Sequence, residues 1–459
     1  MGSRSALACA LALTTVVAAA PAGHAGTPGG VHGGDGPTVG KGLASQIRSE
    51  EKVRSIVELR PGQPVSSVAT DVERASAGAR VLEASASAHF FVAEVDAATL
   101  AELRKDPRVK AVYADQLSVP FLAESTRVIG SDAANRAGWT GRGATVAVLD
   151  MGIDGDHPFL AGRIVDQACF STTDASTGAV SLCPSGRDDQ AGRGAADSRV
   201  ARCLARGVNQ CGHGSHVAGI AAGRFAPGAP GDGVAPGAGI LPIQVFSRLD
   251  SATSCTRVGR QAPCFVSYTS DQKLALEYVT RMARTYNVAS VNMSFGGGGP
   301  HETHCDADPE SAALKSQFDA LLDLGVAPVV AAGNGGAGNG VSAPACISSA
   351  VTVGATDNAD EIAAFSNRGP LLDLFAPGVA ITSSVPDDAY ATMSGTSMST
   401  PHVAGAFAVM KQAFPTLDAV QILQRLRATG RSIVYSADAR RLGTPRLAVG
   451  RATAPSAAR

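Results

Sequence analysis

Residues 395–405, GTSMSTPHVAG, place one serine, Ser397, between a flexible Gly-Thr step and a run of small residues typical of a helix. Pro401 lies close enough to the start of that helix to be tolerated. A hydroxyl at a helix N-terminus faces backbone N–H groups that can stabilise developing negative charge. Because serine is a weak nucleophile at neutral pH, it needs a base and a group that orients the base. The segment therefore predicts a nucleophile with partners elsewhere in the chain.

Three further segments supply the groups that such a serine needs. In ATVAVLDMGIDGDHP, Asp150 ends an apolar strand, where open parallel sheets place ligand-facing residues. In GHGSHVAGIAAG, His213 lies between glycines at the start of a helix of small residues. In VVAAGNGG, Asn334 follows a strand on a Gly-rich loop, where its amide can donate to an oxyanion. These groups predict acyl transfer, in which Ser397 attacks, His213 moves the proton and Asp150 orients the imidazole.

The motifs, in the chain order Asp, His, Ser, resemble those of the subtilisin-like serine proteases, the subtilase family. The similarity includes GVAPGAGILPIQVF and NMSFGG and spans most of residues 125–430. It implies a three-layer α/β fold, a mostly parallel sheet flanked by helices, and peptide hydrolysis that requires no cofactor. It also implies two sets of substrate-binding residues. They are Ser294, Phe295 and Gly296, which would pair with the substrate as an added strand, and Ala331, Ala332 and Gly333, which would line the first-residue pocket.

Several positions depart from the family pattern. Met151 replaces the usual Ser or Thr after the aspartate, and Ser399 replaces the usual alanine, without loss of a principal role. Phe159 stands where the family's strong calcium site often has Asp, so structural calcium is possible but not assignable, and we assign no metal ligands. The stretch 166–210 is longer than in compact members. We expect it to flank the active site and to restrict substrates.

The N-terminus is typical of an export signal. Arg4 precedes an apolar run from Ala6 to Ala20, which is shorter than the roughly 20 residues that a membrane span needs. We expect residues 1–25 to be a signal peptide and the protein to be secreted, extracellular and monomeric. A formal net charge of −1 and a pI of about 6.8 favour neither nucleic acid nor a membrane as a partner.

Three segments follow the signal. Residues 26–51 are rich in Gly and polar residues, and we expect a flexible linker. Residues 52–118 show the order βαββαβ of a small ferredoxin-like α+β module, which resembles the inhibitory propeptide of the family. Residues 119–459 would form the peptidase domain, with a mature start near Val119. The resemblance thus implies that the chain's own propeptide is an intramolecular inhibitor and folding chaperone.

The peptidase segment alternates apolar strands with helices, which implies a parallel sheet covered on both faces. The predicted strands are 144–150, 240–246, 289–295, 327–333 and 350–356, and the predicted helices are 270–286, 309–325 and 416–430.

Nine cysteines are present, and Cys9 would leave with the signal. The eight others, in an exported chain without a CxxC pair, favour disulfides over zinc. We expect pairing between sequence neighbours, with Cys255–Cys264 the first choice and Cys305–Cys346 the second.

Other histidines of the chain are alternative candidates for a catalytic or metal-binding role. His216 and His402 lie inside the catalytic motifs, and we interpret them as packing or hydrogen-bonding residues. A third segment has the side chains of a metal site but the spacing His-x-x-His, and we interpret it as a disulfide-tied loop. Its residues are His301, His304, Cys305, Asp306 and Asp308.

The sequence thus predicts a secreted serine endopeptidase, made as a self-processing zymogen, that acts on polypeptides. The alternative is a catalytically silent peptide-binding protein on the same fold. Within the enzyme class, the substrate is either proteins in general or one dedicated precursor. Gly335, after Asn334, puts no charge near the first-residue pocket, so we expect a small or apolar side chain there.

Overall fold

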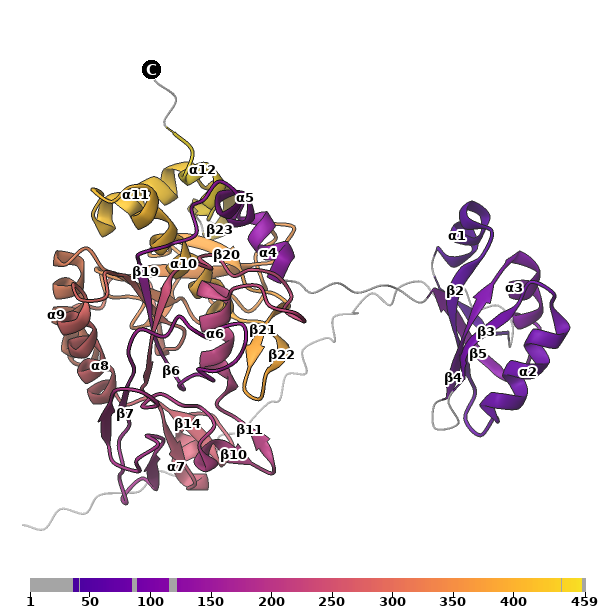
Figure 1. The fold of residues 1–459 in the computed structure, drawn as a ribbon, viewed down its shortest axis with the longest axis horizontal. Helices are drawn as coiled ribbons and strands as arrows, with labels where there is room; N and C mark the ends of the chain where they lie inside the picture. Colours follow the sequence, from indigo (N-terminus) through magenta and orange to yellow (C-terminus); the bar gives the residue numbers. More distant parts are fainter. Residues whose placement is uncertain (1–35, 41, 85–88, 115–121, 439, 456–459) are drawn as a thin grey trace, which may run out of the picture. The chain divides into compact units, whose positions relative to one another are not determined.

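A computed structural model gives the fold of the chain (Figure 1), which divides into two compact units, residues 1–118 and 119–459. The structure describes residues 36–40, 42–84, 89–114, 122–438 and 440–455. The expected signal peptide and the expected mature start near Val119 lie outside these residues. In the described part of the chain, no helix combines the length and the apolar character needed to cross a membrane.

The first unit is a sheet of order β1-β5-β2-β4-β3 with helices packed on it. Its elements are β1 (Thr38–Val39), α1 (Leu43–Glu50), β2 (Val53–Leu59), α2 (Val65–Ala75), β3 (Arg80–Ala84), β4 (Phe90–Val95), α3 (Ala97–Leu103) and β5 (Val109–Ala114). From β2 onward the chain follows the order βαββαβ. Helix α2 buries Val65, Val68, Ala69 and Val72, the spacing of one helix face, against the sheet.

The expectation of a flexible linker over residues 26–51 is wrong for its described part. Strand β1 pairs in parallel with β5, and α1 buries Leu43 and Ile47 in the core of the first unit. These two residues are four apart and therefore share one helix face. Two apolar residues in a Gly-rich stretch gave too weak a pattern to predict this helix.

The second unit is built on a ten-stranded sheet of order β23-β24-β20-β19-β17-β15-β6-β12-β7-β9. Its strands are β6 (Thr145–Asp150), β7 (Ala168–Phe170), β9 (Asp189–Ala191), β12 (Gly239–Gln244), β15 (Val288–Met293), β17 (Ala327–Ala331), β19 (Val351–Thr356), β20 (Leu374–Pro377), β23 (Arg431–Ala437) and β24 (Arg440–Arg446). Neighbours from β7 to β24 pair in parallel, and only the outermost strands, β9 and β23, are antiparallel. All five predicted strands are confirmed.

Helices cover both faces of this sheet (Figure 1). One layer contains α6 (Gly212–Ala222) and α10 (Thr396–Ala413), and the other contains α8 (Thr269–Met282) and α9 (Pro309–Asp323). Strand β6 shows the division residue by residue. Val146 and Val148 belong to the core under α6 and α10, whereas Ala147 and Leu149 belong to the core under α8 and α9. The predicted three-layer α/β fold is confirmed.

Smaller elements complete the second unit. They are α4 (Leu122–Val128), α5 (Ser131–Arg136), β8 (Ala179–Ser181), η1 (Ala201–Cys203), β10 (Leu204–Ala205), β11 (Val208–Asn209), β13 (Ser247–Leu249), α7 (Ala252–Arg257), β14 (Cys264–Val266), β16 (Gly297–His301), β18 (Val341–Ala343), β21 (Ile381–Val385), β22 (Ala389–Met393), α11 (Ala419–Thr429) and α12 (Val449–Ala452). The predicted helix over 416–430 begins later than its pattern suggests, because Asp418 and Gln421 form a capping box at its start.

Candidate active site

The candidate site lies at the carboxyl edge of the parallel sheet. Strands β6, β15 and β17 are neighbours, with Met293 in register with Leu149 on one side and with Val330 on the other. Asp150 and Ser294 are therefore the next positions on adjacent strands, about 4.8 Å apart in the pairing direction. Open α/β sheets bind their ligands at this edge.

A carboxylate–imidazole pair forms at the end of β6. His213 Nδ1 lies 2.9 Å from each carboxylate oxygen of Asp150 and donates its proton there. The Asp150 side chain is 1% exposed, whereas that of His213 is 28% exposed. The backbone N–H of Met151 also donates to Asp150. The carboxylate therefore keeps a hydrogen bond at this position, although Met151 lacks the hydroxyl of the Ser or Thr that the family usually has there. This contact fixes the tautomer and leaves Nε2 of His213 able to accept a proton.

Two opposing effects set the pKa of His213. Burial of the imidazole works to lower it, but the negative charge of Asp150 and the hydrogen bond to it raise it, and the net shift is upward. A raised pKa makes the imidazole a stronger base toward a nearby hydroxyl.

A close backbone approach positions α6 beside the end of β6. His213 is the second residue of this helix, and Gly214 follows it. A Cβ at Gly214 would collide with the carbonyl oxygen of Gly152 and lie 3.2 Å from Cβ of Asp150. Only glycine fits here, because any side chain would push α6 away from the acid.

Ser397 is the second residue of α10 and is tied to the end of β15. Its hydroxyl donates to the carbonyl of Ser294 at 2.8 Å, and the hydroxyl of Ser294 donates to the carbonyl of Ser397 at 2.8 Å. Asn292 in turn donates to the Ser294 hydroxyl. The Ser397 hydroxyl is therefore turned toward Ser294, and no hydrogen bond joins it to His213 among the described residues. Catalytic hydrogen bonds are often long in unliganded structures and tighten when substrate binds.

The amide of Asn334 is oriented by Thr396, a residue that the sequence motifs did not single out. Oδ1 of Asn334 accepts from the backbone N–H of Thr396 at 2.8 Å and from its hydroxyl at 2.9 Å. The Thr396 hydroxyl also accepts from the N–H of Gly333. A Cβ at Gly395 would lie 3.3 Å from Nδ2 of Asn334 and 3.6 Å from N of Ser397, so both donors border one small space. Such a pair of donors is the arrangement that an oxyanion requires.

The predicted substrate-binding residues surround the same sheet edge. Phe295 and Gly296 lie between β15 and β16, outside both strands, and Gly296 is exposed. The Phe295 ring packs edge-on against Phe246, with 5.3 Å between centroids. Ser294 is almost fully buried and is hydrogen-bonded to Ser397.

The predicted first-residue pocket is built from small, tightly placed residues. Ala331 and Ala332 are buried, with 4% and 0% exposure. Gly333 has a φ of +105°, and a Cβ there would collide with the side chains of Ser342 and Asn367. The side chains of Ser342 and Asn367 thus pack directly against the backbone of Gly333.

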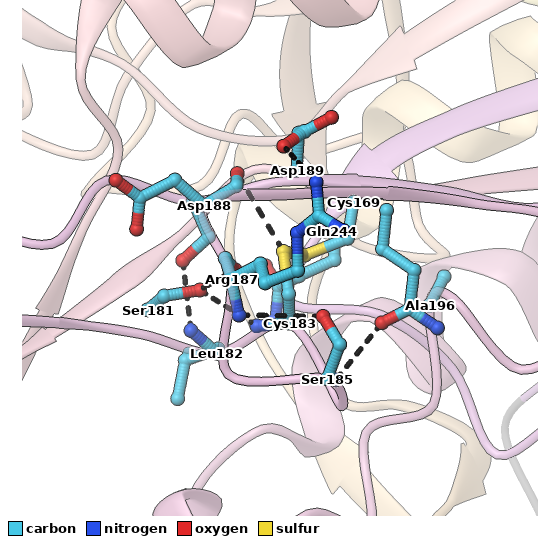
Figure 2. Close-up of a disulfide and its surroundings, with 12 residues drawn as sticks. Cys169, Ser181, Leu182, Cys183, Ser185, Arg187, Asp188, Asp189, Ala196 and Gln244 are labelled. Atoms are coloured by element: carbon cyan, nitrogen blue, oxygen red, sulfur yellow. Dashed lines mark hydrogen bonds and ion pairs between the residues drawn. A yellow bond between two sulfur atoms is a disulfide. The ribbon is translucent and has the colours of Figure 1, made fainter.

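The insertion at 166–210 forms its own small framework next to the site. Strands β7 and β9 extend the main sheet, and β8 joins β13 and β14 in a separate three-stranded sheet. Figure 2 shows the disulfide between Cys169 and Cys183, beside which the Ser181 hydroxyl donates to the Arg187 carbonyl at 2.7 Å. A second disulfide, Cys203–Cys211, ends directly before α6.

An ion cluster joins this insertion to the loop after Asp150. Arg199 lies 3.3 Å from Asp154 and 2.6 Å from Asp156. Asp154 is buried, and its Oδ2 accepts from the N–H of Asp387. Burial, with a hydrogen bond that the protonated Asp154 donates to the Asp156 carboxylate, raises the pKa of Asp154 to about 6 against the opposing charge of Arg199. Sequence reasoning gave no signal for this contact, because it joins residues 45 positions apart in a loop without periodicity.

All disulfides of the described chain join sequence neighbours, as predicted. They are Cys169–Cys183, Cys203–Cys211, Cys255–Cys264 and Cys305–Cys346. The two that the sequence favoured are confirmed. Because Cys305 is bonded to Cys346, it offers no thiolate to the neighbouring histidines, and His301 instead lies 3.6 Å from Asp308.

The two other motif histidines are structural. His216 is fully buried, and its Nε2 lies 3.0 Å from the carbonyls of Ile381 and Ala391. His402 is also buried, with Nδ1 donating to the Met398 carbonyl at 2.8 Å and Nε2 2.8 Å from the Ser125 hydroxyl. Burial lowers the pKa of each to about 4, so both are neutral core residues.

The family model and the curated relatives agree with one family. A family model described as the subtilase family, peptidase S8, matches residues 141–445. Subtilisin E from Bacillus subtilis (strain 168) is 32% identical over 357 residues, which are 75% of this chain and 77% of that protein. The extracellular serine proteinase of Thermus sp. (strain Rt41A) is 33% identical over 362 residues, 76% of this chain and 73% of that protein. A solved structure titled as a cold adapted subtilisin-like serine proteinase aligns with 29% identity and a TM-score of 0.47, covering 67% of this chain and 88% of that one.

Proposed function

The chain belongs to the subtilase family and is a serine endopeptidase, and we propose that Asp150, His213 and Ser397 are its catalytic triad. The observation that supports this assignment most directly is the buried Asp150 carboxylate, bonded through both oxygens to Nδ1 of His213. Ser397 begins α10 at the same edge of the sheet, bonded to the residue next in register to Asp150.

The proposed reaction proceeds in two acyl-transfer steps. Ser397 Oγ attacks the peptide carbonyl while Nε2 of His213 takes its proton, and the carbonyl oxygen becomes an oxyanion facing Asn334 and the N–H of Ser397. His213 then gives the proton to the leaving amine, and the C–N bond breaks. Water, deprotonated by His213, attacks the acyl-enzyme ester. The ester C–O bond then breaks, His213 returns that proton to Ser397 Oγ, and the second product leaves as the carboxylic acid. Asp150 remains ionised throughout and stabilises the imidazolium.

A serine-directed test separates this proposal from a silent peptide-binding protein. An organophosphorus reagent should label the purified, folded protein covalently at Ser397, and Ser397→Ala should abolish both the label and peptide hydrolysis. Ser394→Ala is a matched control, because Ser394 is an exposed serine just before α10 whose hydroxyl accepts from the N–H of Ala380. Unchanged hydrolysis by Ser397→Ala would overturn the assignment.

We also propose that the chain is exported and processed as a zymogen. Residues 1–25 would be removed as a signal, and residues 52–118 would act as inhibitory propeptide, with α1 and β1 added to its core. The ferredoxin-like order of the first unit supports the second role, and the disulfide-bonded cysteines of the second unit support an oxidising destination.

N-terminal sequencing of the secreted protein tests both steps. We expect the active form to begin near Val119 and the Ser397→Ala form to retain the first unit in the same polypeptide. A Ser397→Ala protein that is cut at the same bond during expression, free of other proteases, would contradict self-processing.

For the substrate, we propose a small or apolar side chain in the first-residue pocket. The small residues Ala331, Ala332 and Gly333 support this choice, and Gly335 adds no charge. A profile of peptides cleaved from a random library would measure it. A strict preference for Lys or Arg before the cut would contradict it.

A further inference from the structure

Arg163 is a buried cation that is held by backbone carbonyls. Its side chain is among the buried groups, with 9% exposure. Nη2 donates to the carbonyl of Phe159 at 2.8 Å, and Nη1 donates to the carbonyls of Ala222 and, at 3.3 Å, Pro236. None of the ion pairs between described residues includes this guanidinium. Beyond hydrogen-bond distance, Arg224 repels it and Asp232 attracts it. A full positive charge is thus held at Nη1 and Nη2 by neutral oxygens, whereas its buried Nε has no hydrogen-bond partner among the described residues.

The three carbonyls come from three separate pieces of the fold. Phe159 belongs to the loop after β6, Ala222 is the last residue of α6, and Pro236 precedes β12. The backbone of Arg163 is itself fixed to the sheet, since its carbonyl accepts from the N–H of Ile240 at 2.8 Å. A cation at the C-terminus of α6 also complements the helix dipole. The other end of that helix carries His213.

Members of the subtilase family commonly hold structural calcium near this loop, but the residues present here do not fit the metal. The position that would supply a carboxylate is Phe159, whose ring is completely buried. The ring packs 5.9 Å from that of Tyr390. A Cβ on Gly223, just after α6, would collide with it, and a Cβ on Gly219 of α6 would lie 3.0 Å from it. An aromatic edge offers no ligand to a hard cation, which requires oxygen donors.

We propose that the Arg163 guanidinium replaces a structural calcium ion at this point, as a cation that the chain carries itself. Convergent backbone carbonyls are ligands for Ca²⁺, and the planar fork of arginine can satisfy several of them at once. Although burial lowers the pKa of Arg163 to about 10, the group stays charged at neutral pH. The loop after β6, the end of α6 and the segment before β12 are therefore fixed without metal.

The first test asks whether calcium affects these segments. The full chain carrying Ser397→Ala, which prevents self-digestion, is measured in excess EDTA and in millimolar CaCl2 by thermal unfolding and by hydrogen exchange with mass spectrometry. We expect residues 157–165, 212–223 and 233–240 to show the same protection in both. Calcium bound elsewhere would change protection elsewhere, whereas increased protection of these three segments by calcium would overturn the proposal.

The second test removes the guanidinium. In the same background, Arg163→Met should lower Tm by several degrees and reduce protection in the three segments, because buried carbonyls lose their donors. Arg224→Met is the matched control, since Arg224 is an exposed arginine just beyond α6. If Arg163→Met does not fold, Arg163→Lys decides, with a partial loss of Tm expected because the charge remains without the fork. Values equal to those of Arg224→Met, in whichever variant folds, would overturn the proposal.

Discussion

The proton on Nδ1 of His213 points at both oxygens of a carboxylate that water cannot reach. Replacing Asp150 by Asn removes the negative charge, so the pKa of His213 should fall below its raised value and the wrong tautomer should become available. We expect kcat to fall by as much as about 10⁴-fold. The remaining pH–rate profile should shift to lower pH, as measured with a peptide substrate under single-turnover conditions. An unshifted profile would contradict the assigned role of Asp150.

We expect Asn334 to stabilise the oxyanion through Nδ2, because its Oδ1 already accepts hydrogen bonds from Thr396. Asn334→Leu keeps the volume and removes the donor, and kcat should fall about 10²–10³-fold with little change in KM, a magnitude established in a subtilisin. Thr396→Val should give a smaller loss, because it frees the amide to rotate while leaving the donor present. Equal losses in kcat/KM that come entirely from KM would argue against an oxyanion role.

At the scale of elements, a disulfide fixes the start of the helix that carries His213. Cys211 directly precedes α6 and is bonded to Cys203 across the β10–β11 hairpin, and both sulfurs are buried. The chain-entropy model gives a stabilisation of about 2–3 kcal/mol for a loop of this length. The Cys255–Cys264 bridge closes a loop of nearly equal length on α7 and β14.

These two bridges therefore form a matched pair. Replacing both cysteines by Ser in either bridge should cost similar stability, but only Cys203→Ser/Cys211→Ser should lower kcat, because only this bridge adjoins α6. Thermal unfolding and steady-state kinetics on the same samples would measure both effects. If the two double variants show the same kcat, the bridge has no positioning role.

The helices and strands also differ in how well the sequence predicts them. The apolar runs that became β6, β12, β15, β17 and β19 are buried on both faces, and such runs are visible without knowledge of the fold. The short strands of the insertion, two or three residues each, are too brief to show any period. Helix α1 was missed because only Leu43 and Ile47 mark its buried face.

The residues of the candidate site divide in the same way. Asp150, His213, Ser397 and Asn334 were visible because each stands in a local motif at the end of an element. Their supports were not visible, since partners such as Thr396 for Asn334 and Arg199 for Asp154 are chosen by tertiary packing. A sequence shows the groups that can react more readily than the groups that hold them.

For the whole molecule, two buried neutral histidines predict loss of stability in acid. His216 and His402 have pKa values lowered to about 4 by burial, against an ordinary 6.5. Below pH 6.5 these two histidines bind protons in the unfolded chain but stay neutral in the folded chain. Their contribution to the free energy of unfolding is therefore fully present above pH 6.5 and falls as the pH falls toward 4. Each histidine contributes about 1.4 kcal/mol per pH unit in this window. Asp154, with its pKa raised to about 6, opposes part of the loss, because its folded form binds the extra proton.

Urea unfolding of the Ser397→Ala protein between pH 7 and 4.5 would measure this slope. The fluorescence of Trp139, the only tryptophan, reports on the second unit specifically. His402→Gln should flatten the slope, and His304→Gln, at an exposed histidine of the same unit, should leave it unchanged. A slope that is the same in all three proteins would show that His402 does not set the acid limit.

Two loops that are closed by disulfides also bear on how the sequence of this protease could be varied. In the bridges Cys203–Cys211 and Cys255–Cys264, the Cα atoms stand 5.5 and 5.8 Å apart, so each loop returns to where it left the framework. Residues between such anchors can be exchanged, lengthened or shortened at a small entropic cost, which grows only slowly with loop length. The residues within these two loops can therefore be replaced while the paired cysteines are kept. Sequence libraries placed between the paired cysteines should therefore yield many folded proteases in which Asp150, His213 and Ser397 are unchanged, as thermal unfolding would measure.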